Sequence, residues 1–561
     1  MSLIDRRLGL LFAAFVVLLG LVLVRAAWVQ GLDGGSLSSQ AQSQQVEQIM
    51  VPGSRGAILD RSGKQLAVSE DAATVFATPY QVEDPEAAAR KLGALLETPE
   101  PEILAALADL DSGFAYLERK VDLATAEKIE QLELAGIGML PDSRRIYPQG
   151  ELGAQVIGTV GIDNQGLTGL EAAEEEVLHG TDGEREVVRD ALGEELERST
   201  TAAAEAGSDL RLTIDASIQA ETERVLAGIG ETYQPEGATA IVMDPRSSEI
   251  LAMANYPAFD PSDPAGADPD ALRNIATGFT YEPGSTFKAF TVAGALEDGV
   301  VTPDTPFDLP PTLQVADRVI EESHPRGYVT LPVSEILAQS SNVGAVKVGM
   351  ALNDEFGDPS YGGRFDHWIH QFGFGQPTGI RFPGDEQGIM VAPDDYSGST
   401  MGNLPIGQGL SVTPMQMAAA YSAIAGDGVL RTPQLISEAE GVAVAPDPGE
   451  QVISPENAAK LREMLEGVLA PGGTAAEVSV PGYTLAGKTG TAQKVVDGVY
   501  SDSDFVASFV GFAPAEDPEL LVAVVVDTPR GDYYGGTVAA PAFGELAAFV
   551  LPYLGIPPDQ D

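Results

Sequence analysis

Residues 285–299 read STFKAFTVAGALEDG, and this stretch decides how the second half of the chain is interpreted. Its apolar residues recur at helical spacing and it closes on Gly299, which predicts a helix beginning at or beside Ser285. On such a helix Ser285 and Lys288 share a face, so the Lys288 amine can lie within hydrogen-bond reach of the Ser285 hydroxyl. Among the nine lysines, Lys288 alone follows a serine at this spacing. We interpret the pair as a nucleophile and its base.

A lysine can activate a serine hydroxyl if burial and a nearby cation lower the pKa of the amine. Two later motifs supply the missing parts. Lys488 in Lys488-Thr489-Gly490 is a candidate for that cation, and in Ser340-Ser341-Asn342 the first serine can relay a proton. Asn342 can hold a substrate amide through its donor and its acceptor. Taken singly, the motifs also fit an N-cap with an exposed lysine, a polar turn and a strand end. The three motifs in this order are the signature of penicillin-binding proteins and class A β-lactamases.

The residues around these motifs predict an α+β fold class, with helices packed on a β-sheet. Two runs joined by the turn DPRSS predict a hairpin, and an apolar run near the C-terminus predicts a closing helix. The predicted strands are Leu210–Ile214, Ala238–Met243, Glu249–Ala254, Ser508–Phe512 and Leu520–Val526, and the closing helix is Pro541–Leu554.

The first part of the body carries no catalytic signal. The small-residue segment TTAAAEAGS, residues 200–208, predicts a domain boundary near residue 207. Upstream of it, short β-like runs alternate with helical stretches. The predicted strands are Gln48–Val51, Gly56–Leu59 and Ala73–Ala77, and the predicted helices are Pro85–Leu96, Glu100–Leu110 and Ala124–Leu132.

The N-terminus predicts a membrane anchor. Leu8–Val24 contains no charged or amide side chain, and with residues 26–29 it approaches the thickness of a hydrocarbon core. Arg6 and Arg7 precede it, which by the positive-inside tendency leaves the short tail in the cytoplasm and the body outside. A cleaved signal peptide is the alternative, but the apolar stretch is longer than is usual for one and no clear A-x-A site follows.

Composition excludes several classes of function. The 561 residues include 83 acidic and 32 basic side chains, for a formal charge of -51, so the long-range field repels nucleic acid. The absence of Cys excludes disulfides, thiol nucleophiles and Fe–S clusters. We predict no metal and no cofactor, because His367 and His370 have the H-x-x-H spacing, which is not that of a zinc protease helix.

Together these features resemble a class B penicillin-binding protein, a peptidoglycan D,D-transpeptidase. Besides the three motifs, Arg55-Gly-Ala-Ile-Leu-Asp-Arg61 resembles the family's RGxIxDRxG segment and Gly166-Leu-Thr-Gly-Leu-Glu171 its GxxGxE element. Further blocks resembling the family are Ile406–Leu410 with Thr413-Pro414, and Gly535–Pro541.

The resemblance implies a role for each site residue. Ser285 would be the acyl-accepting nucleophile, Lys288 its base, Ser340 the proton relay and Asn342 the amide clamp. The remaining roles fall on the third motif: Lys488 would tune the electrostatics, Thr489 and Thr491 with Gly490 between them would bind the substrate's terminal carboxylate, and the backbone N–H groups of Ser285 and Thr491 would form the oxyanion hole.

The resemblance also implies an order of domains and a set of partners. It implies a cytoplasmic tail (1–7), a transmembrane anchor (8–29), an extracytoplasmic pedestal of the dimerisation type (30–206) and a transpeptidase domain (207–557). Stem peptides would be the donor and the amine acceptor, and β-lactams covalent inhibitors. Since the pedestal is not a glycosyltransferase, glycan polymerisation would fall to a polytopic glycosyltransferase of the shape, elongation, division and sporulation type.

Subgroup features favour a septal enzyme of the plasma membrane. The S-S-N form of the second motif, with Phe372-Gly-Phe-Gly375 and Pro377-Thr-Gly379, resembles the division-specific subgroup. An elongation-type transpeptidase is the alternative.

Other classes with the same motifs stay open at this point. They are a D,D-carboxypeptidase, a β-lactam sensor or β-lactamase, and a non-enzymatic divisome scaffold. A class A β-lactamase holds a Glu four residues before an Asn in the loop between the second and third motifs. Here the positions four residues before Asn353, Asn403 and Asn457 are Gly349, Ser399 and Ile453. We therefore expect β-lactams to trap the protein as a stable ester.

Overall fold

The computed structural model describes residues 3–31, 46–110, 112–189, 195–355, 363–496 and 498–560. Met1 and Ser2 of the expected cytoplasmic tail, and residues 32–45 at the start of the expected pedestal, lie outside the described residues. The chain divides into two compact units. The first comprises residues 1–54, 70–144 and 180–207, and the second comprises residues 55–69, 145–179 and 208–561.

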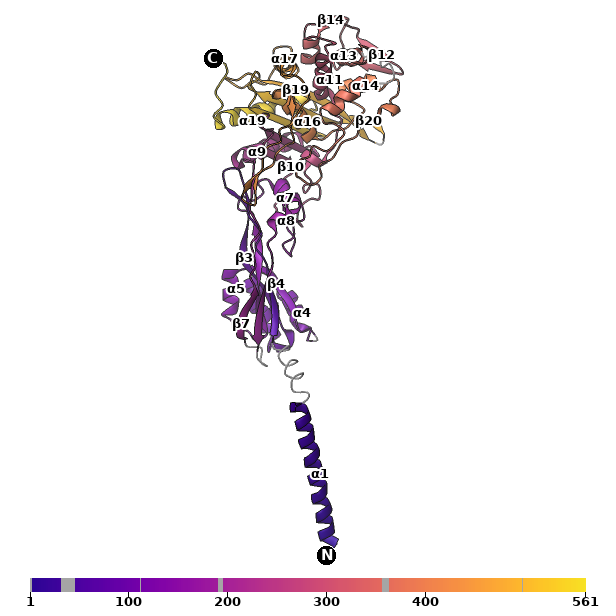
Figure 1. Cartoon of the computed structure of the whole chain (residues 1–561). Coiled ribbons are helices and arrows are strands. Elements are labelled where there is room, and N and C mark those ends of the chain that lie inside the picture. The colour runs from indigo at the N-terminus through magenta and orange to yellow at the C-terminus, as the bar shows by residue number, and fades with distance from the viewer. Residues whose placement is uncertain are drawn as a thin grey trace. The chain divides into compact units, whose positions relative to one another are not determined.

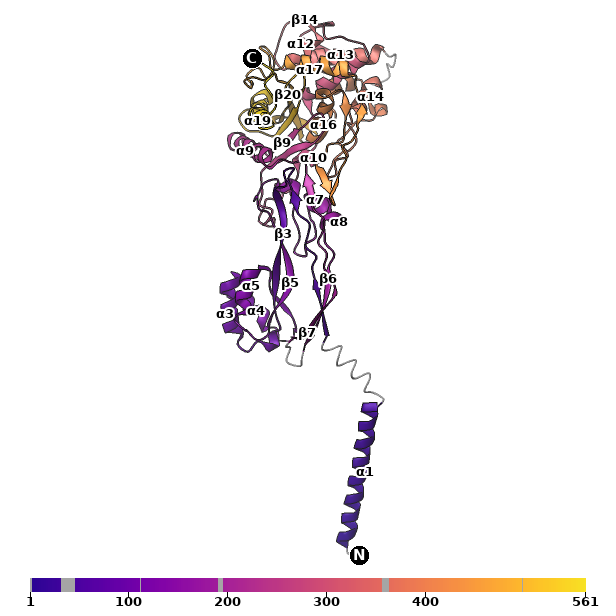
Figure 2. The ribbon, with the colours of Figure 1, turned by 60° about the vertical axis from the view of Figure 1, so that its left-hand side comes forward.

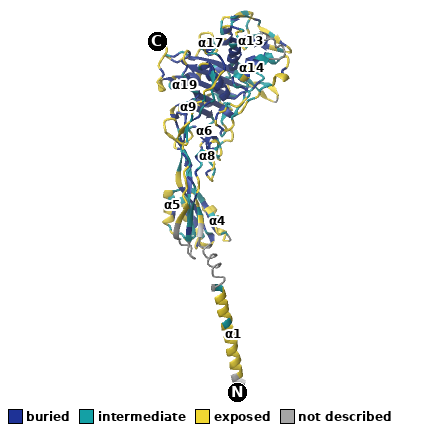
Figure 3. Ribbon diagram, in the orientation of Figure 1, coloured by how far each residue is buried: buried dark blue, intermediate teal, exposed yellow. Residues whose placement is uncertain are grey.

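Helix α1 (Leu3–Gly31) contains the predicted anchor. Its large apolar side chains from Leu8 to Trp28 are exposed, as the mostly yellow ribbon in Figure 3 shows. It is a candidate membrane-spanning helix from Arg6 to Val29. Helix α19 (Ala540–Tyr553) is part of a second segment with suitable length and composition, but most of that segment is buried inside the molecule. Helix α19 is therefore a core helix of the second unit.

The first unit contains two groups of strands. Strand β6 (Gly183–Arg189) pairs antiparallel with β1 (Val46–Val51) and β7 (Glu195–Ala202). The part of β3 (Gln65–Ala77) that follows Glu70 pairs with β4 (Ala115–Asp122). Apolar residues of β3 and β4 pack against three helices, which Figure 2 shows on one side of the strands of this unit. The remaining elements are η1 (Pro79–Gln81), α3 (Pro85–Leu96), α4 (Glu100–Ala108), α5 (Leu123–Glu130) and β5 (Ile137–Ile146).

The second unit is built on a five-stranded antiparallel sheet, with the strand order β10-β9-β21-β20-β19. Helices α9 and α19 lie on one side of this sheet and α16 lies on the other (Figures 1 and 2). Strand residues are buried on both faces, since both carry helices. The elements are α9 (Ala216–Tyr233), β9 (Gly237–Met243), β10 (Ile250–Tyr256), α16 (Pro414–Ala425), β19 (Ala486–Val496), β20 (Val499–Ala513) and β21 (Leu520–Asp527).

The second unit also contains a helical layer with small hairpins, which includes the turn that carries Ser285. It contains α10 (Ile275–Gly278), η2 (Gly284–Phe287), α11 (Lys288–Glu297), β11 (Pro306–Leu309), β12 (Thr312–Val315), β13 (Arg318–Glu321), β14 (Val329–Pro332), α12 (Val333–Ala338), α13 (Asn342–Glu355), α14 (Gly363–Gln371), η3 (Pro393–Asp395), α15 (Thr400–Asn403), η4 (Leu404–Ile406), α17 (Pro455–Glu466) and α18 (Gly535–Val538).

The second unit also contains several short strands and helices. Strand β8 (Leu210–Leu212) pairs with β2 (Ile58–Leu59) in parallel and with β16 (Ile436–Ala439) antiparallel. The others are α6 (Ala154–Ile157), α7 (Gly169–Ala173), α8 (Glu175–Leu178), β15 (Val429–Leu430), β17 (Val442–Ala443) and β18 (Glu450–Gln451).

The predicted α+β architecture is confirmed, and so is the hairpin, as β9 and β10 pair antiparallel. The prediction for β20 was too short. This strand begins at Val499 and pairs with β19 beyond the edge of the buried sheet, where the polar run SDSD hides the strand pattern. Residues 55–69 and 145–179, which lie inside the segment expected to form the pedestal, pack with the second unit.

Candidate active site

Ser285 lies in a single 3₁₀ turn, η2, which runs directly into α11. Gly284 has φ of 55°, a conformation that a glycine adopts without strain, and its N–H donates to the Gly407 carbonyl at 3.0 Å. On the buried side of the turn, the Tyr421 hydroxyl donates to the Thr286 carbonyl at 2.6 Å. Thr286 and Phe287 are buried whereas Ser285 is partly exposed. The turn therefore holds Ser285 on a fixed backbone at a partly exposed position.

Lys288, the first residue of α11, joins the first motif to the second. Its side chain is only 1% exposed. Nζ donates to the Ser340 carbonyl at 2.6 Å, to Asn342 Oδ1 at 2.6 Å and to Ser340 Oγ at 3.2 Å. Three residues that the sequence placed in one site are thus in direct contact.

Burial lowers the pKa of Lys288 from 10.5 to about 7. The Glu322 carboxylate opposes this shift and the Arg326 guanidinium adds to it. Sequence reasoning assigned the role of the neighbouring cation to Lys488, but the cation that lowers the pKa of Lys288 is Arg326. A lysine that is half neutral near pH 7, about one helical turn after the partly exposed Ser285, can act as a general base for that serine.

The second motif forms the connection between α12 and α13. Ser340 has φ of 57°, an uncommon conformation for a residue with a side chain, and it turns the Ser340 carbonyl and Oγ to Lys288. Asn342 Nδ2 donates to the Glu321 carbonyl at 2.8 Å while Oδ1 accepts from Lys288. Each end of the amide retains capacity for a second hydrogen bond, which a substrate amide can use.

The third motif lies on β19, beside the η2 turn that carries Ser285. Lys488 is fully buried, and burial followed by the charge of Lys288 lowers its pKa well below the usual range. Its Nζ donates to the Thr489 carbonyl at 3.3 Å. At Gly490, a Cβ atom would lie 2.3 Å from Ser508 Oγ and 3.0 Å from the Pro283 carbonyl. Only glycine therefore lets β19 approach the turn that carries Ser285.

Both threonines of the third motif are held by residues from outside it. The Thr489 and Thr474 hydroxyl oxygens lie 2.7 Å apart, and Thr491 Oγ1 accepts from the Gly535 N–H at 3.0 Å. A Cβ atom at Gly535 would lie 2.2 Å from the Gly490 carbonyl. The C-terminal block that the sequence singled out as Gly535–Pro541 thus packs on the third motif.

Several polar residues of the site were missed in the sequence. They contact the motifs through tertiary structure and lie in irregular segments or on helices where no spacing marks them. These residues are Glu322, Arg326, Tyr421 and Thr474.

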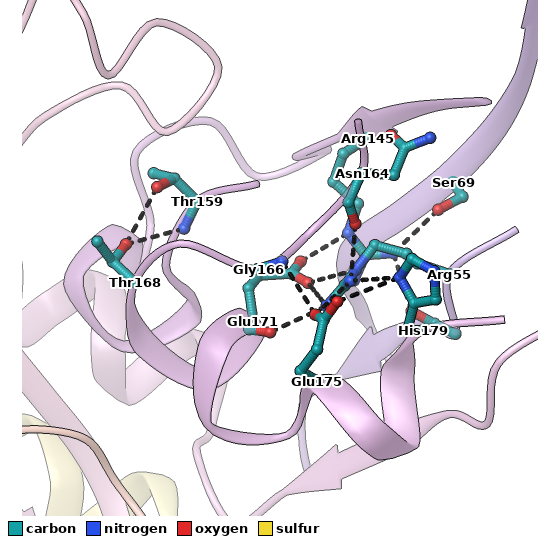
Figure 4. Close-up of polar contacts among 11 residues, drawn as sticks. Arg55, Ser69, Arg145, Thr159, Asn164, Gly166, Thr168, Glu171, Glu175 and His179 are labelled. Carbon is teal, nitrogen blue, oxygen red and sulfur yellow. Dashed lines mark hydrogen bonds and ion pairs between the residues drawn. The ribbon is translucent and has the colours of Figure 1, made fainter. Parts of the chain in front are cut away.

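A second polar cluster joins the two N-terminal segments that the sequence singled out, and Figure 4 shows it. Glu171 is fully buried and accepts from Arg55 Nε at 2.9 Å and from Arg145 Nε at 2.7 Å. Arg55 also donates to Glu175 at 2.6 Å, and Arg145 to the Gly56 carbonyl at 2.8 Å. The cluster holds these segments together within the second unit.

Residues 238–548 match the family described as the penicillin binding protein transpeptidase domain, and residues 50–212 match the penicillin-binding protein dimerisation domain. The chain is 37% identical to stage V sporulation protein D of Bacillus subtilis over 98% of this chain and 86% of that protein. It is 33% identical to the peptidoglycan D,D-transpeptidase FtsI of Escherichia coli over 99% and 93%. Penicillin-binding protein 3 of Mycobacterium tuberculosis, solved with aztreonam, superposes with a TM-score of 0.71 at 28% identity, covering 91% of this chain and 98% of that one.

Proposed function

The chain belongs to the class B penicillin-binding proteins, the serine peptidoglycan D,D-transpeptidases, and we propose that its acyl-enzyme forms on Ser285. The observation that carries this proposal is the position of the buried Lys288 amine. Lys288 begins α11, directly after the turn that carries Ser285, and its amine donates hydrogen bonds to Ser340 and Asn342. No other lysine of the sequence has a serine three positions before it. β-Lactams are covalent inhibitors of this enzyme class.

The reaction follows from the positions of these groups. Neutral Lys288 takes the proton of the Ser285 hydroxyl as Oγ attacks the carbonyl of the donor's D-Ala-D-Ala peptide bond. The backbone N–H groups of Ser285 and Thr491 stabilise the oxyanion. Collapse breaks the C–N bond, Ser340 passes the proton to the departing D-Ala amine, and an ester remains. An acceptor amine attacks this ester, forms the cross-link and returns the proton to Ser285.

The other site residues orient the donor peptide. Asn342 binds the amide next to the scissile bond, and Thr489 with Thr491 binds the terminal carboxylate. Gly490 allows the substrate strand to lie along β19. Lys488 contributes positive potential when it is protonated.

Intact-mass spectrometry with penicillin tests the nucleophile. We expect one adduct per chain, stable for hours, because the opened β-lactam leaves no departing fragment and no Glu precedes Asn353, Asn403 or Asn457 at β-lactamase spacing. Ser285→Ala loses the adduct, while the control Ser397→Ala, on an exposed loop, retains it. An adduct that disappears within seconds as penicilloate accumulates contradicts the proposal.

A carboxypeptidase would use the same acyl-enzyme with water as its acceptor. Incubation with a pentapeptide donor and an excess of an amine acceptor separates the two activities. The transpeptidase gives cross-linked product in proportion to acceptor, whereas a carboxypeptidase gives free D-Ala and unlinked tetrapeptide.

We propose that residues 8–29 anchor the protein in the plasma membrane with residues 30–206 as pedestal and 207–557 as the extracytoplasmic transpeptidase domain. The exposed apolar surface of α1 supports the anchor. The similarity to FtsI supports a septal enzyme. We propose that this enzyme works beside a polytopic glycosyltransferase. A fluorescent fusion that labels the lateral wall evenly, with no band at midcell, contradicts the septal assignment.

A further inference from the structure

The segment between β13 and β14 brings an ion pair to the back of the second motif. Arg326 Nη2 lies 2.5 Å from Glu322 Oε1, and the two side chains are only 21% and 6% exposed. Both contact the middle serine of the motif. Arg326 Nη2 donates to Ser341 Oγ at 2.6 Å, and the Ser341 hydroxyl donates to Glu322 Oε1 at 2.7 Å.

Glu322 also holds the backbone of the motif. Its Oε2 accepts from the Asn342 N–H at 2.8 Å, at the start of α13. The residue before it, Glu321, accepts from Asn342 Nδ2. Ser340 and Asn342, the two residues that bond Lys288 Nζ, thus flank a serine that the ion pair fixes on both sides.

The two charges act on the base in opposite directions. Glu322 raises the pKa of Lys288 and Arg326 lowers it. The neighbouring elements present three further groups to this lysine. Ser340 and Asn342 of the second motif are uncharged, and Lys488 from β19 is a second amine. The net effect of this ion pair on the pKa of Lys288 is therefore the difference between two opposing charge effects.

We propose that Glu322 and Arg326 are positioning residues, which hold the Ser340–Asn342 segment against Lys288 and balance the charge around that amine. The proposal rests on the function proposed for Ser285 and Lys288. A purely structural ion pair would change the stability of the second unit when it is broken. It would leave the pH dependence of acylation unchanged, and this difference makes the proposal testable.

The experiment measures the rate constant for acylation by a fluorescent penicillin between pH 5.5 and 9.5 in the full chain. Only neutral Lys288 accepts the proton, so the rate rises with pH through the pKa of the lysine and then levels off. In Arg326→Gln the lost positive charge raises that pKa, and the rising limb moves to higher pH. In Glu322→Gln the lost negative charge lowers it, and the limb moves to lower pH.

We expect each shift to be at least about half a pH unit, which is about a threefold change in rate on the acid side of the limb. Glu322→Gln with Arg326→Gln removes both charges and brings the limb back between those of the single variants. Arg326→Lys keeps the positive charge but loses the planar set of guanidinium donors. We expect its rising limb to move by less than about half a pH unit, while its plateau rate falls.

Two surface variants control for the change in net charge. Arg246→Gln removes a guanidinium that pairs with Asp517 and Glu519, and Glu456→Gln removes a carboxylate that pairs with Lys460. Both should leave the limb in place. Thermal unfolding of every variant reports stability separately.

Limbs that move in the same direction in the two single variants, or that do not move, overturn the proposal. If one Gln variant fails to fold, the rising limb of the other is compared with that of Arg326→Lys. This comparison then decides the question. A parent protein that labels with penicillin but shows no such shifts retains its proposed function and loses this inference. A parent protein that does not label at all loses the function itself.

Discussion

Lys288, the proposed general base, weakens the fold that holds it. The unfolded chain binds a proton at this amine below its ordinary pKa of 10.5, whereas the folded protein binds it only below about 7. Between those values the unfolded state holds more protons, so the free energy of unfolding rises with pH across this window. As pH falls toward 7, the free energy of unfolding therefore decreases.

The variant Lys288→Met removes this titration. We expect the rise in the free energy of unfolding between pH 7 and 9 to be smaller than in the parent, by up to about 1.4 kcal/mol per pH unit. Lys488, whose pKa is also lowered, keeps part of the rise in the variant. Urea unfolding at several pH values measures the difference, with the partly exposed Lys460→Met as control. Equal pH slopes in Lys288→Met and the parent contradict the assigned pKa.

At the scale of elements, η2 depends on the loop that precedes α16. Gly407 has φ of 75°, and a Cβ atom there would lie 2.1 Å from the Gly284 carbonyl oxygen. Gly284 also donates its N–H to the Gly407 carbonyl, so the two backbones are in contact. A side chain at position 407 must push away the turn that carries Ser285.

We therefore expect Gly407→Ala to reduce the rate of acylation by penicillin at least about tenfold, because an ångström of displacement misaligns the nucleophile. Gly441→Ala is the matched control. Gly441 has nearly the same φ, 72°, but no atom within 4 Å of the added Cβ, so this variant carries only the backbone strain. Equal acylation rates in the two variants would show that the contact with Gly284 is unimportant.

At the scale of the whole molecule, the Arg55–Glu171–Arg145 cluster determines how separate segments of the second unit stay together. Glu171→Ala leaves two buried guanidinium groups without their shared carboxylate. Breaking a buried ion pair in this way costs about 3–5 kcal/mol. Chemical unfolding should show that loss, and Glu176→Ala, at an exposed position on the next short helix, α8, should change stability little. A loss of less than about 1 kcal/mol in Glu171→Ala contradicts this role.

The formal charge of -51 acts on the folded chain as a whole. Acidic groups repel one another in the compact state, and salt screens this repulsion over about 10 Å at 0.1 M and about 3 Å at 1 M. We expect the midpoint of thermal unfolding to rise between 0.05 and 1 M KCl. Sulfate stabilises proteins by a different route, through stronger hydrophobic burial. A rise with sulfate but none with chloride would therefore refute the electrostatic explanation.

The sequence determined the features that repeat locally. The helical spacing after Ser285, the two runs joined by the turn DPRSS in β9 and β10, and the long apolar run in α1 each predicted an element that the structure contains. The three motifs could be recognised because the chemistry needs fixed residue types over a few positions. Local spacing also placed Lys288 on one helical face with Ser285.

Only the tertiary structure decided what surrounds those residues. Glu322 and Arg326 lie in an irregular segment where no period marks them, and the structure brings them to Ser341 and to the base. The cation expected from Lys488 is supplied by Arg326, because burial leaves Lys488 itself with a lowered pKa. Likewise, Arg55 and Glu171 are 116 residues apart and form one ion pair. A sequence records spacing along the chain, whereas burial and charge depend on distances through space, which only the folded chain sets.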